Sequence, residues 1–443
     1  MSRKLLLVNP VGRRAHGLAS NPISLFPPLG LGTVAALTPG DWEIEIADEN
    51  FEPFEYREAS LVGLTAFTSV ATRAYEIAAL YRERGVPTVL GGIHASMLPD
   101  EALQCVDTVV TGEAESVWPK LIADFEAGAM QRLYRGELGD LRGMPKPRRD
   151  LFHPRYRFGT IQTSRGCPMD CEFCSVSAFN GRHYRQRPVE EVLDELETIP
   201  HKRLFIVDDN IVGHGTRATA RALALFKGII ARGIKKEWIC QASLNFAENE
   251  EVLEYAAKAG CRVVFIGVEA DSVDALAEVN KRTNLRMGVD GYEEAFRRIR
   301  RHGMAVLGAF IYGMDSDTPD ALRRRTQYIL NSGVDIIQIT YLTALPGTRL
   351  FDRLQKEGRL LYTNFPADWE RYHMVEATHR PLSMEPQEIL DVIREGNHLL
   401  YSRRALLRRF LKTWRATRNL TTALWALRLI TGYRNIAIGT GHY

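Results

Sequence analysis

Three cysteines lie within eight residues of this chain, at Cys167, Cys171 and Cys174, and their type and spacing could hold a metal centre. A cubane iron–sulfur cluster has four irons, so three thiolates from one short loop leave one iron free for a ligand that is not protein. Structural zinc sites instead close their coordination shell with four protein ligands, often in paired Cys-x2-Cys units. The spacing therefore favours an iron–sulfur cluster, and the alternatives are a chance group of cysteines or a three-ligand zinc site.

The run around these cysteines, with the aromatic Phe173 just before the last one, resembles the signature of the radical S-adenosylmethionine (SAM) enzymes. In that family a [4Fe-4S] cluster binds SAM through its free iron, and an electron from the cluster splits SAM to a 5′-deoxyadenosyl radical. The resemblance implies that Cys167, Cys171 and Cys174 are metal ligands and catalytic residues and that Phe173 belongs to the cofactor site. It also implies an electron donor such as flavodoxin or ferredoxin.

Length and composition are those of a globular protein with more than one domain. The chain has 443 residues, 45% of them hydrophobic and 25% charged, which suggests two or three domains. A formal net charge of +3 gives no field that would attract nucleic acid. No stretch approaches the roughly 20 apolar residues that cross a bilayer, and the first apolar run is too short for a secretory signal. We therefore expect a cytoplasmic protein, in which the scattered Cys105, Cys240 and Cys261 are core residues.

The first part of the chain alternates short apolar runs with helical stretches, which predicts a doubly wound parallel sheet over residues 1–128. Ligands of such sheets bind in the loops that follow the strands. The expected strands are Lys4–Val8, Glu43–Ala47, Leu61–Leu64, Pro87–Leu90 and Thr108–Val110.

The loops of this sheet, together with the run Pro27-Pro28-Leu29-Gly30-Leu31, resemble the cobalamin-binding domain that precedes many radical SAM cores. The resemblance implies that glycines let the backbone approach cobalamin, that hydroxyls meet its nucleotide tail, and that other loop residues line the lower face of its ring. The D-x-H-x-x-G motif that supplies an axial histidine in other cobalamin proteins is missing, so a hydrogen-bonding role for His94 is the alternative to a ligand role. The candidate residues are Thr65, Phe67, Thr68, Ser69, Gly91, Gly92, His94, Gly112 and Glu113.

After an irregular, polar stretch that predicts a linker over residues 129–158, strand and helix alternate again in six units over residues 159–350. Six such units give an open partial (β/α)6 barrel, which agrees with the radical SAM fold, and Cys167 directly follows the first strand. The expected strands are Thr160–Ser164, Leu204–Val207, Trp238–Ala242, Val263–Val268, Ala305–Ile311 and Asp335–Thr340.

Polar residues follow several of these strands, and an unpaired carboxylate is costly to bury without a partner. In related enzymes the end of the second strand contacts the methionine amino group of SAM, and later strands hold its ribose. The resemblance assigns Asp208, Asp209 and Asn210 to the first role and Ser243 and Glu269 to the second. The alternative is that some of them cap the helices that follow.

Residues 351–443 predict a small helical extension with a basic end. Nine arginines and lysines lie between Arg403 and Arg434 with no acidic residue among them. A basic amphipathic terminus is typical of a membrane-surface anchor, which would place the protein at the inner face of the membrane. The alternative is an ordinary helix that docks on the barrel. The extension also resembles that of lipid-modifying members, such as those that methylate hopanoids.

The resemblance implies a cobalamin-dependent radical SAM methyltransferase that adds a methyl group to an unactivated carbon. Such a carbon has no lone pair to attack the sulfonium of SAM, so radical chemistry is needed. The expected substrate is a small lipophilic molecule, a lipid or a tetrapyrrole. Two alternatives stay open: a cyclase, ring-contracting or oxidising enzyme with the same cofactors, and a cobalamin- or cluster-holding protein that senses redox state or assists assembly.

Overall fold

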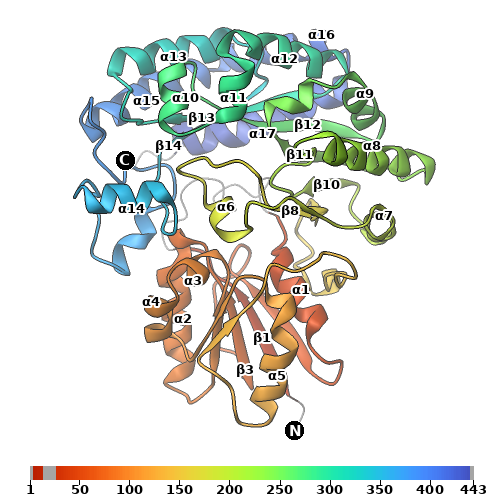
Figure 1. Cartoon of the computed structure of the whole chain (residues 1–443), viewed down its shortest axis with the longest axis vertical. Coiled ribbons are helices and arrows are strands. Elements are labelled where there is room, and N and C mark those ends of the chain that lie inside the picture. The colour runs from red at the N-terminus through yellow and green to blue at the C-terminus, as the bar shows by residue number, and fades with distance from the viewer. Residues whose placement is uncertain (1–2, 13–25, 440–443) are drawn as a thin grey trace.

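The computed structural model describes residues 3–12 and 26–439, which form two successive six-stranded parallel sheets with their helices. Figure 1 shows the N-terminal sheet at the bottom, the second sheet with its helices above it, and helix α6 (Ser175–Phe179) between the two. The predicted fold class is confirmed: a doubly wound sheet, a partial barrel and a helical C-terminal extension.

The N-terminal sheet has the strand order β2-β1-β3-β4-β5-β6. Alternate side chains of β1 enter two hydrophobic cores, Leu6 and Val8 on one face and Leu5 and Leu7 on the other, because helices cover both faces. The chain passes from β1 to β2 on one side and then to β3 on the other, which makes a switch point of the kind where ligands bind. The elements are β1 (Lys4–Asn9), α1 (Leu29–Leu37), β2 (Glu43–Asp48), β3 (Leu61–Thr65), α2 (Ala71–Arg82), β4 (Thr88–Gly91), α3 (Ile93–Met97), α4 (Pro99–Cys105), β5 (Thr108–Thr111), α5 (Trp118–Glu126) and β6 (Leu133–Arg135).

The last strand, β6, was not expected, because it lies inside the segment for which the sequence predicts a linker. It pairs with β5 in parallel, but only Tyr134 of its three residues is buried. One buried residue makes no hydrophobic pattern from which a strand could be predicted. A domain boundary at residue 128 would separate this strand from its sheet. The other predicted domain limits stay predictions.

The second sheet has the order β14-β13-β12-β11-β10-β7, so its strands follow chain order and its edges, β7 and β14, stay unjoined in the described structure. Its strands are β7 (Gly159–Ile161), β10 (Arg203–Ile206), β11 (Glu237–Ala242), β12 (Cys261–Glu269), β13 (Ala305–Tyr312) and β14 (Ile336–Tyr341), and β8 (Ser164–Arg165) pairs separately with β9 (Arg185–Gln186). Its helices are α7 (Val189–Thr198), α8 (Thr216–Ala231), α9 (Glu250–Lys258), α10 (Val273–Glu278), α11 (Arg282–Met287), α12 (Tyr292–Arg301), α13 (Pro319–Asn331) and α14 (Arg349–Lys356).

Three helices form the C-terminal extension: α15 (Pro386–Leu400), α16 (Arg403–Thr417) and α17 (Leu420–Gly439). Helix α17 packs against β12, β13 and β14, and Trp425 is only 4% exposed, with its ring edge-on to Phe158. The alternative of a helix that docks on the barrel therefore describes α17. Among the described residues, no helix is both long enough and apolar enough to cross a membrane.

A short 3-10 helix, η7 (Ala367–Arg371), returns from the barrel to the N-terminal sheet, where it contacts α2. The indole of Trp369 donates a hydrogen bond of 2.9 Å to the Glu101 carboxylate, and the Thr72 hydroxyl donates one of 3.0 Å to Glu370. The segment that contains η7 thus ties the two sheets together, and Trp369 is part of this junction.

Candidate active site

The three cysteines lie on the loop between β8 and α6, at the carboxyl end of the barrel strands. Cys171 is buried, Cys167 and Cys174 are half-buried, and all three are free thiols. Burial raises the pKa of each thiol, that of Cys174 to about 12, so these thiols stay protonated unless a metal takes them as thiolates. Gly166 enters the loop with φ of +89°, where an added Cβ would lie 2.3 Å from the His183 carbonyl oxygen, so only glycine fits.

Two aspartates after β10 hold the start of this loop. Asp208 is fully buried and accepts hydrogen bonds from the Thr163 amide (2.5 Å), the Thr163 hydroxyl (2.6 Å) and the Ser164 hydroxyl (2.7 Å). Asp209 accepts from the Gly166 amide and the Asn180 side chain, both at 3.0 Å, and burial raises its pKa. Protein groups occupy both oxygens of Asp208 and one oxygen of Asp209, so both carboxylates position the cysteine loop. Their predicted contact with SAM stays a prediction.

A cation that the sequence analysis missed completes this support. Arg221 of α8 donates to the Thr163 hydroxyl (2.9 Å), to the Thr163 carbonyl (3.1 Å) and to the Arg187 carbonyl (3.0 Å). It reaches the loop from a helix more than 50 residues further along the chain, so no local motif could have pointed to it.

The other end of the cysteine loop is held by two more segments. The Glu172 amide donates to the Val279 carbonyl (3.1 Å), and the Asn280 side chain donates to the Asp170 carbonyl (2.6 Å). From α14, Arg353 donates to both oxygens of the Glu172 carboxylate, at 2.9 and 3.2 Å.

The run Ala344–Thr348 leads from the end of β14 to α14. Gly347 has φ of +79°, and a Cβ there would lie 2.2 Å from the sulfur of Met97 in α3. This run therefore lies between the cysteine loop and the N-terminal sheet.

Glu269 ends β12 in a strained conformation. Its φ is +64°, and the register of β12 against β13 shifts beside it. Bulges of this kind aim a side chain, and they occur often next to active sites. Its carboxylate pairs with Lys281 at 2.5 Å. Burial opposes the charge on Lys281, yet Glu269 raises the pKa of its ammonium, and Cys171 and Cys174 add to this effect as thiolates. A cation therefore lies beside two of the three cysteines.

Two further predicted SAM contacts lie together. The Asn210 side chain, 1% exposed, donates to the Ser243 hydroxyl at 3.1 Å. Ser243 and Phe173 are half-buried, and Phe173 packs against the barrel core. The predicted SAM contacts of Ser243, Glu269 and Phe173 stay predictions. The side chain of Asn210 bonds to the Ser243 hydroxyl and to the Val212 amide.

The rim of the N-terminal sheet is more open. Phe67, directly after β3, is 73% exposed, and Thr65 and Ser69 are half-buried, whereas Thr68 is buried. A Cβ on Gly91 would meet no atom closer than 3.8 Å, whereas one on Gly92, with φ of +94°, would lie 2.8 Å from the Thr65 hydroxyl oxygen. Gly92 is thus required by the fold, and Gly91 leaves space that a ligand can use.

His94 does not line this rim. Its side chain is fully buried, its Nε2 lies 3.0 Å from the Tyr75 hydroxyl and 3.2 Å from Glu101, and its Nδ1 lies 3.4 Å from the Thr68 hydroxyl. His94 is thus buried with both ring nitrogens facing protein groups, away from the open rim. The predicted contact of Thr68 with cobalamin stays a prediction. The alternative, a hydrogen-bonding histidine, is the one that fits.

Glu113 and Gly112 serve the junction between the sheets rather than an open pocket. Glu113 is 7% exposed and pairs with Arg165 at 3.1 Å and Arg185 at 2.6 Å. Gly112 approaches β6, since its Cβ would lie 2.3 Å from the Gly136 carbonyl oxygen. Glu113 thus links the N-terminal sheet to Arg165, two positions before Cys167. The predicted contacts of Gly112 and Glu113 with cobalamin stay predictions.

The donor set fits an iron–sulfur cluster and a corrinoid. In a cubane each cysteine binds a different iron, so the three sulfur atoms do not converge on one ion, as the ligands of a single metal would. Among the described residues, no three His, Cys, Asp or Glu side chains converge as they would around a single metal ion. The space at Gly91 and the exposed ring of Phe67 suit a flat macrocycle that covers apolar surface.

Two family models match the chain, and they divide it between the two sheets. The B12 binding domain model matches residues 16–122, and the radical SAM superfamily model matches residues 161–329, which includes the cysteine loop. The chain therefore contains a region similar to B12 binding domains, followed by a region similar to the radical SAM superfamily. The B12-binding domain thus contains the open rim around Phe67, and the radical SAM domain contains the loop with Cys167, Cys171 and Cys174.

Relatives and solved structures agree over most of the length. The bacteriochlorophyllide d C-12(1)-methyltransferase of Chlorobaculum tepidum is 27% identical, over 92% of this chain and 89% of that protein. The hopanoid C-2 methylase of Rhodopseudomonas palustris is 29% identical, over 82% and 72%. The structure of the radical SAM methyltransferase TsrM from Kitasatospora setae superposes with a TM-score of 0.70 at 20% identity, over 90% and 89%, which shows a shared fold.

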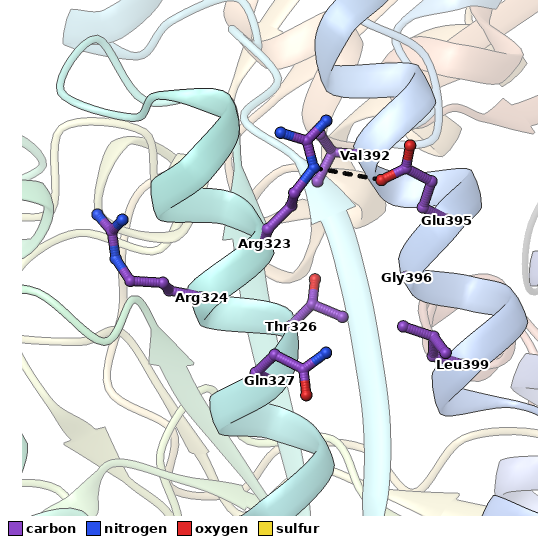
Figure 2. A pocket seen from close by; sticks show the side chains of 8 residues that line it. All are labelled: Arg323, Arg324, Thr326, Gln327, Val392, Glu395, Gly396 and Leu399. Carbon is purple, nitrogen blue, oxygen red and sulfur yellow. Dashed lines mark hydrogen bonds and ion pairs between the residues drawn. The ribbon is translucent and has the colours of Figure 1, made fainter.

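A surface groove of about 340 Å³ lies elsewhere, between α13 and α15. Figure 2 shows Arg323 and Glu395 joined across it at 3.3 Å, while Arg324 points away from α15. None of the predicted site residues lines this groove, so it is separate from the cysteine loop.

Proposed function

We propose that this chain is a cobalamin-dependent radical SAM methyltransferase that adds a methyl group to an unactivated carbon of a small lipophilic molecule. The observation that carries the proposal is the contact between α3, which follows the Gly91 loop of the B12-binding domain, and α6, which follows the cysteine loop. Two cofactors held on these loops would share one space, where a substrate could reach both.

In this proposal Cys167, Cys171 and Cys174 hold the cluster, Phe173, Ser243 and Glu269 hold SAM, and Thr65, Phe67, Ser69, Gly91 and Gly92 lie against cobalamin. The cluster with SAM would supply a radical able to remove hydrogen from an unactivated carbon, and cobalamin would supply the methyl group.

The remaining residues position these groups. Asp208, Asp209 and Arg221 fix the start of the cysteine loop, and Arg353 fixes its end. Lys281 contributes a positive charge beside thiols that must become thiolates, which favours their charged form. Glu113 joins the two domains through Arg165, so the cofactors keep one relative orientation.

The substrate class follows from the relatives. Two of them are named for methylation of a hopanoid and of a bacteriochlorophyllide, and they match more than four fifths of this chain. We infer a polycyclic lipid or a tetrapyrrole as substrate, a flavodoxin or ferredoxin as electron donor, and a place at the membrane surface.

The test is a product count under anaerobic, reducing conditions with cobalamin, SAM and either a hopanoid or a bacteriochlorophyllide. Methylation predicts one 5′-deoxyadenosine and one S-adenosylhomocysteine for each methylated product, because two SAM molecules are used. 5′-Deoxyadenosine without S-adenosylhomocysteine would indicate the cyclase or oxidising alternative, and neither product would indicate a redox-sensing or assembly role. Cys174→Ala should abolish both products, and Cys105→Ala, outside the loop, should keep them.

A further inference from the structure

Exposed apolar side chains gather on the C-terminal extension. Of the twelve large hydrophobic side chains that are exposed in the described part of the chain, five fall between residues 399 and 424. They are Leu399, Leu407, Trp414, Leu420 and Leu424, with exposed fractions from 42% to 61%. A concentration of this kind marks an interaction surface, whereas single exposed apolar residues do not.

On α16 the apolar residues form one stripe. At about 100° per residue, Leu407, Leu411 and Trp414 lie within about 60° of one another around the helix axis. Arg409, Thr413 and Thr417 lie on the opposite side and are buried. Helix α17 packs beside α16 and adds the exposed Leu420 and Leu424 just after the turn between them.

Arginines surround this stripe. Arg403, Arg404, Arg408, Arg415 and Arg418 are exposed, and none of them has an acidic partner among the residues that the structure describes. The last acidic residue of the chain is Glu395, so no carboxylate follows to neutralise them. By contrast, Arg409 and Lys412 bond to backbone carbonyls of the barrel: the buried Arg409 donates to Ile329, and Lys412 donates to Ser332 at the end of α13.

We propose that this face, made of Leu407, Leu411, Trp414, Leu420 and Leu424 with the five exposed arginines, binds the surface of an anionic lipid bilayer. An indole and leucines that enter the interface, flanked by arginines that reach phosphate groups, are the composition of an interfacial helix. A second copy of the chain fits this face less well, because it would bring like charges together without a carboxylate between them.

An electron donor is also disfavoured, because the face lies far from the cysteine loop. Helix α16 contacts the segments that precede β13 and β14: Thr413 bonds to Asp335, and Arg300 donates to the Lys412 carbonyl. The cysteine loop lies at the other end of the strands, and the eight residues of β13 span roughly 26 Å. The face therefore anchors the molecule without covering the site.

Co-sedimentation of the full chain with vesicles tests the proposal. We expect binding to equimolar phosphatidylcholine and phosphatidylglycerol, weak binding to phosphatidylcholine alone, and loss of binding at high salt. Arg404→Gln or Arg408→Gln should each lower the partition coefficient about fivefold, the factor that corresponds to about 1 kcal/mol per charge. The double variant Leu407→Gln/Trp414→Gln should lower it further.

The matched control is Leu382→Gln/Val273→Gln, which changes two exposed apolar residues outside this face and should bind like the unaltered chain. All these positions are exposed, so circular dichroism and the melting temperature should not change. Equal sedimentation of the Leu407→Gln/Trp414→Gln variant and its control would overturn the proposal, as would sedimentation that ignores the lipid charge. A dimer in solution that this variant abolishes would assign the face to a second copy instead. Because vesicle binding needs neither cofactors nor turnover, its failure is separate from failure of the proposed methylation.

Discussion

The carboxyl ends of the two sheets differ in how open they are. At the end of the barrel strands, Asp208, Asp209 and Asn210 bond to other protein groups. At the end of the N-terminal sheet, Phe67 is 73% exposed, and the space next to Gly91 is open. Both oxygens of Asp208 and one oxygen of Asp209 accept hydrogen bonds from the residues that begin the cysteine loop. This difference in openness follows from the cofactor that each end of the molecule is proposed to hold. A cluster needs three thiols fixed relative to one another, so the barrel commits its carboxylates to holding a loop, while a large flat cofactor needs open surface.

The largest expected effect concerns the barrel end that holds the cysteine loop. Asp208→Asn should lower the free energy of unfolding by about 3–5 kcal/mol, because it removes the buried charge that Thr163, Ser164 and Arg221 surround. Denaturant unfolding measures the change, and the exposed Asp274→Asn is the matched control, with no more than about 0.5 kcal/mol expected. Equal losses for the two variants would show that Asp208 is free for a ligand after all.

The contribution of Glu113 to stability, through its ion pairs with Arg165 and Arg185, should depend on pH. Burial raises the pKa of Glu113, but the hydrogen bond from Arg185 and the charge of Arg165 outweigh this and leave it below its usual value of 4.5. A depressed pKa stabilises the folded chain above the unfolded value and loses this contribution as the pH falls through the folded value. Glu113→Gln should therefore cost about 2 kcal/mol at pH 7 and clearly less below pH 4. Urea unfolding of both proteins at the two pH values checks this, and a pH-independent difference would argue against the ion pairs.

Two neighbouring glycines on the open rim of the N-terminal sheet allow the effect on folding to be measured separately from the effect on ligand binding. Gly92→Ala should destabilise the chain by about 1–3 kcal/mol, because φ of +94° with ψ of −177° is open almost only to glycine. Gly91→Ala should leave the melting temperature unchanged but lower the amount of cobalamin that the purified chain retains. If Gly91→Ala unfolds the chain, or retains cobalamin fully, the space at Gly91 serves no ligand.

The smallest effect on stability should come from Phe67. Phe67→Ala should not alter unfolding, since the ring is 73% exposed, but should weaken cobalamin binding about tenfold or more through lost apolar contact. Equilibrium dialysis with hydroxocobalamin measures the affinity. Leu382→Ala, also 73% exposed, is the control, and the same affinity for both variants would remove Phe67 from the site.

The sequence predicted both sheets, because their strands are continuous apolar runs, and it predicted the cysteine loop, because three ligands lie in one segment. It did not predict β6, whose single buried residue, Tyr134, makes no pattern. It did not show that Asp208, Asp209, His94 and Glu113 bond to protein groups, since a polar residue after a strand has the same sequence signal whether it meets a ligand or another loop. Arg221 and Lys281 were missed because Arg221 reaches the site from α8 and Lys281 from the residue before α11, and only the three-dimensional structure brings them there.

The most direct test of the central claim, that the loop of Cys167, Cys171 and Cys174 holds a cubane with one iron open to SAM, is electron paramagnetic resonance of the anaerobically reconstituted, reduced chain before and after SAM is added. We predict a [4Fe-4S] signal whose g values shift with SAM and which disappears in Cys174→Ala. Zinc in place of iron, or a cluster signal that SAM leaves unchanged, would contradict the account.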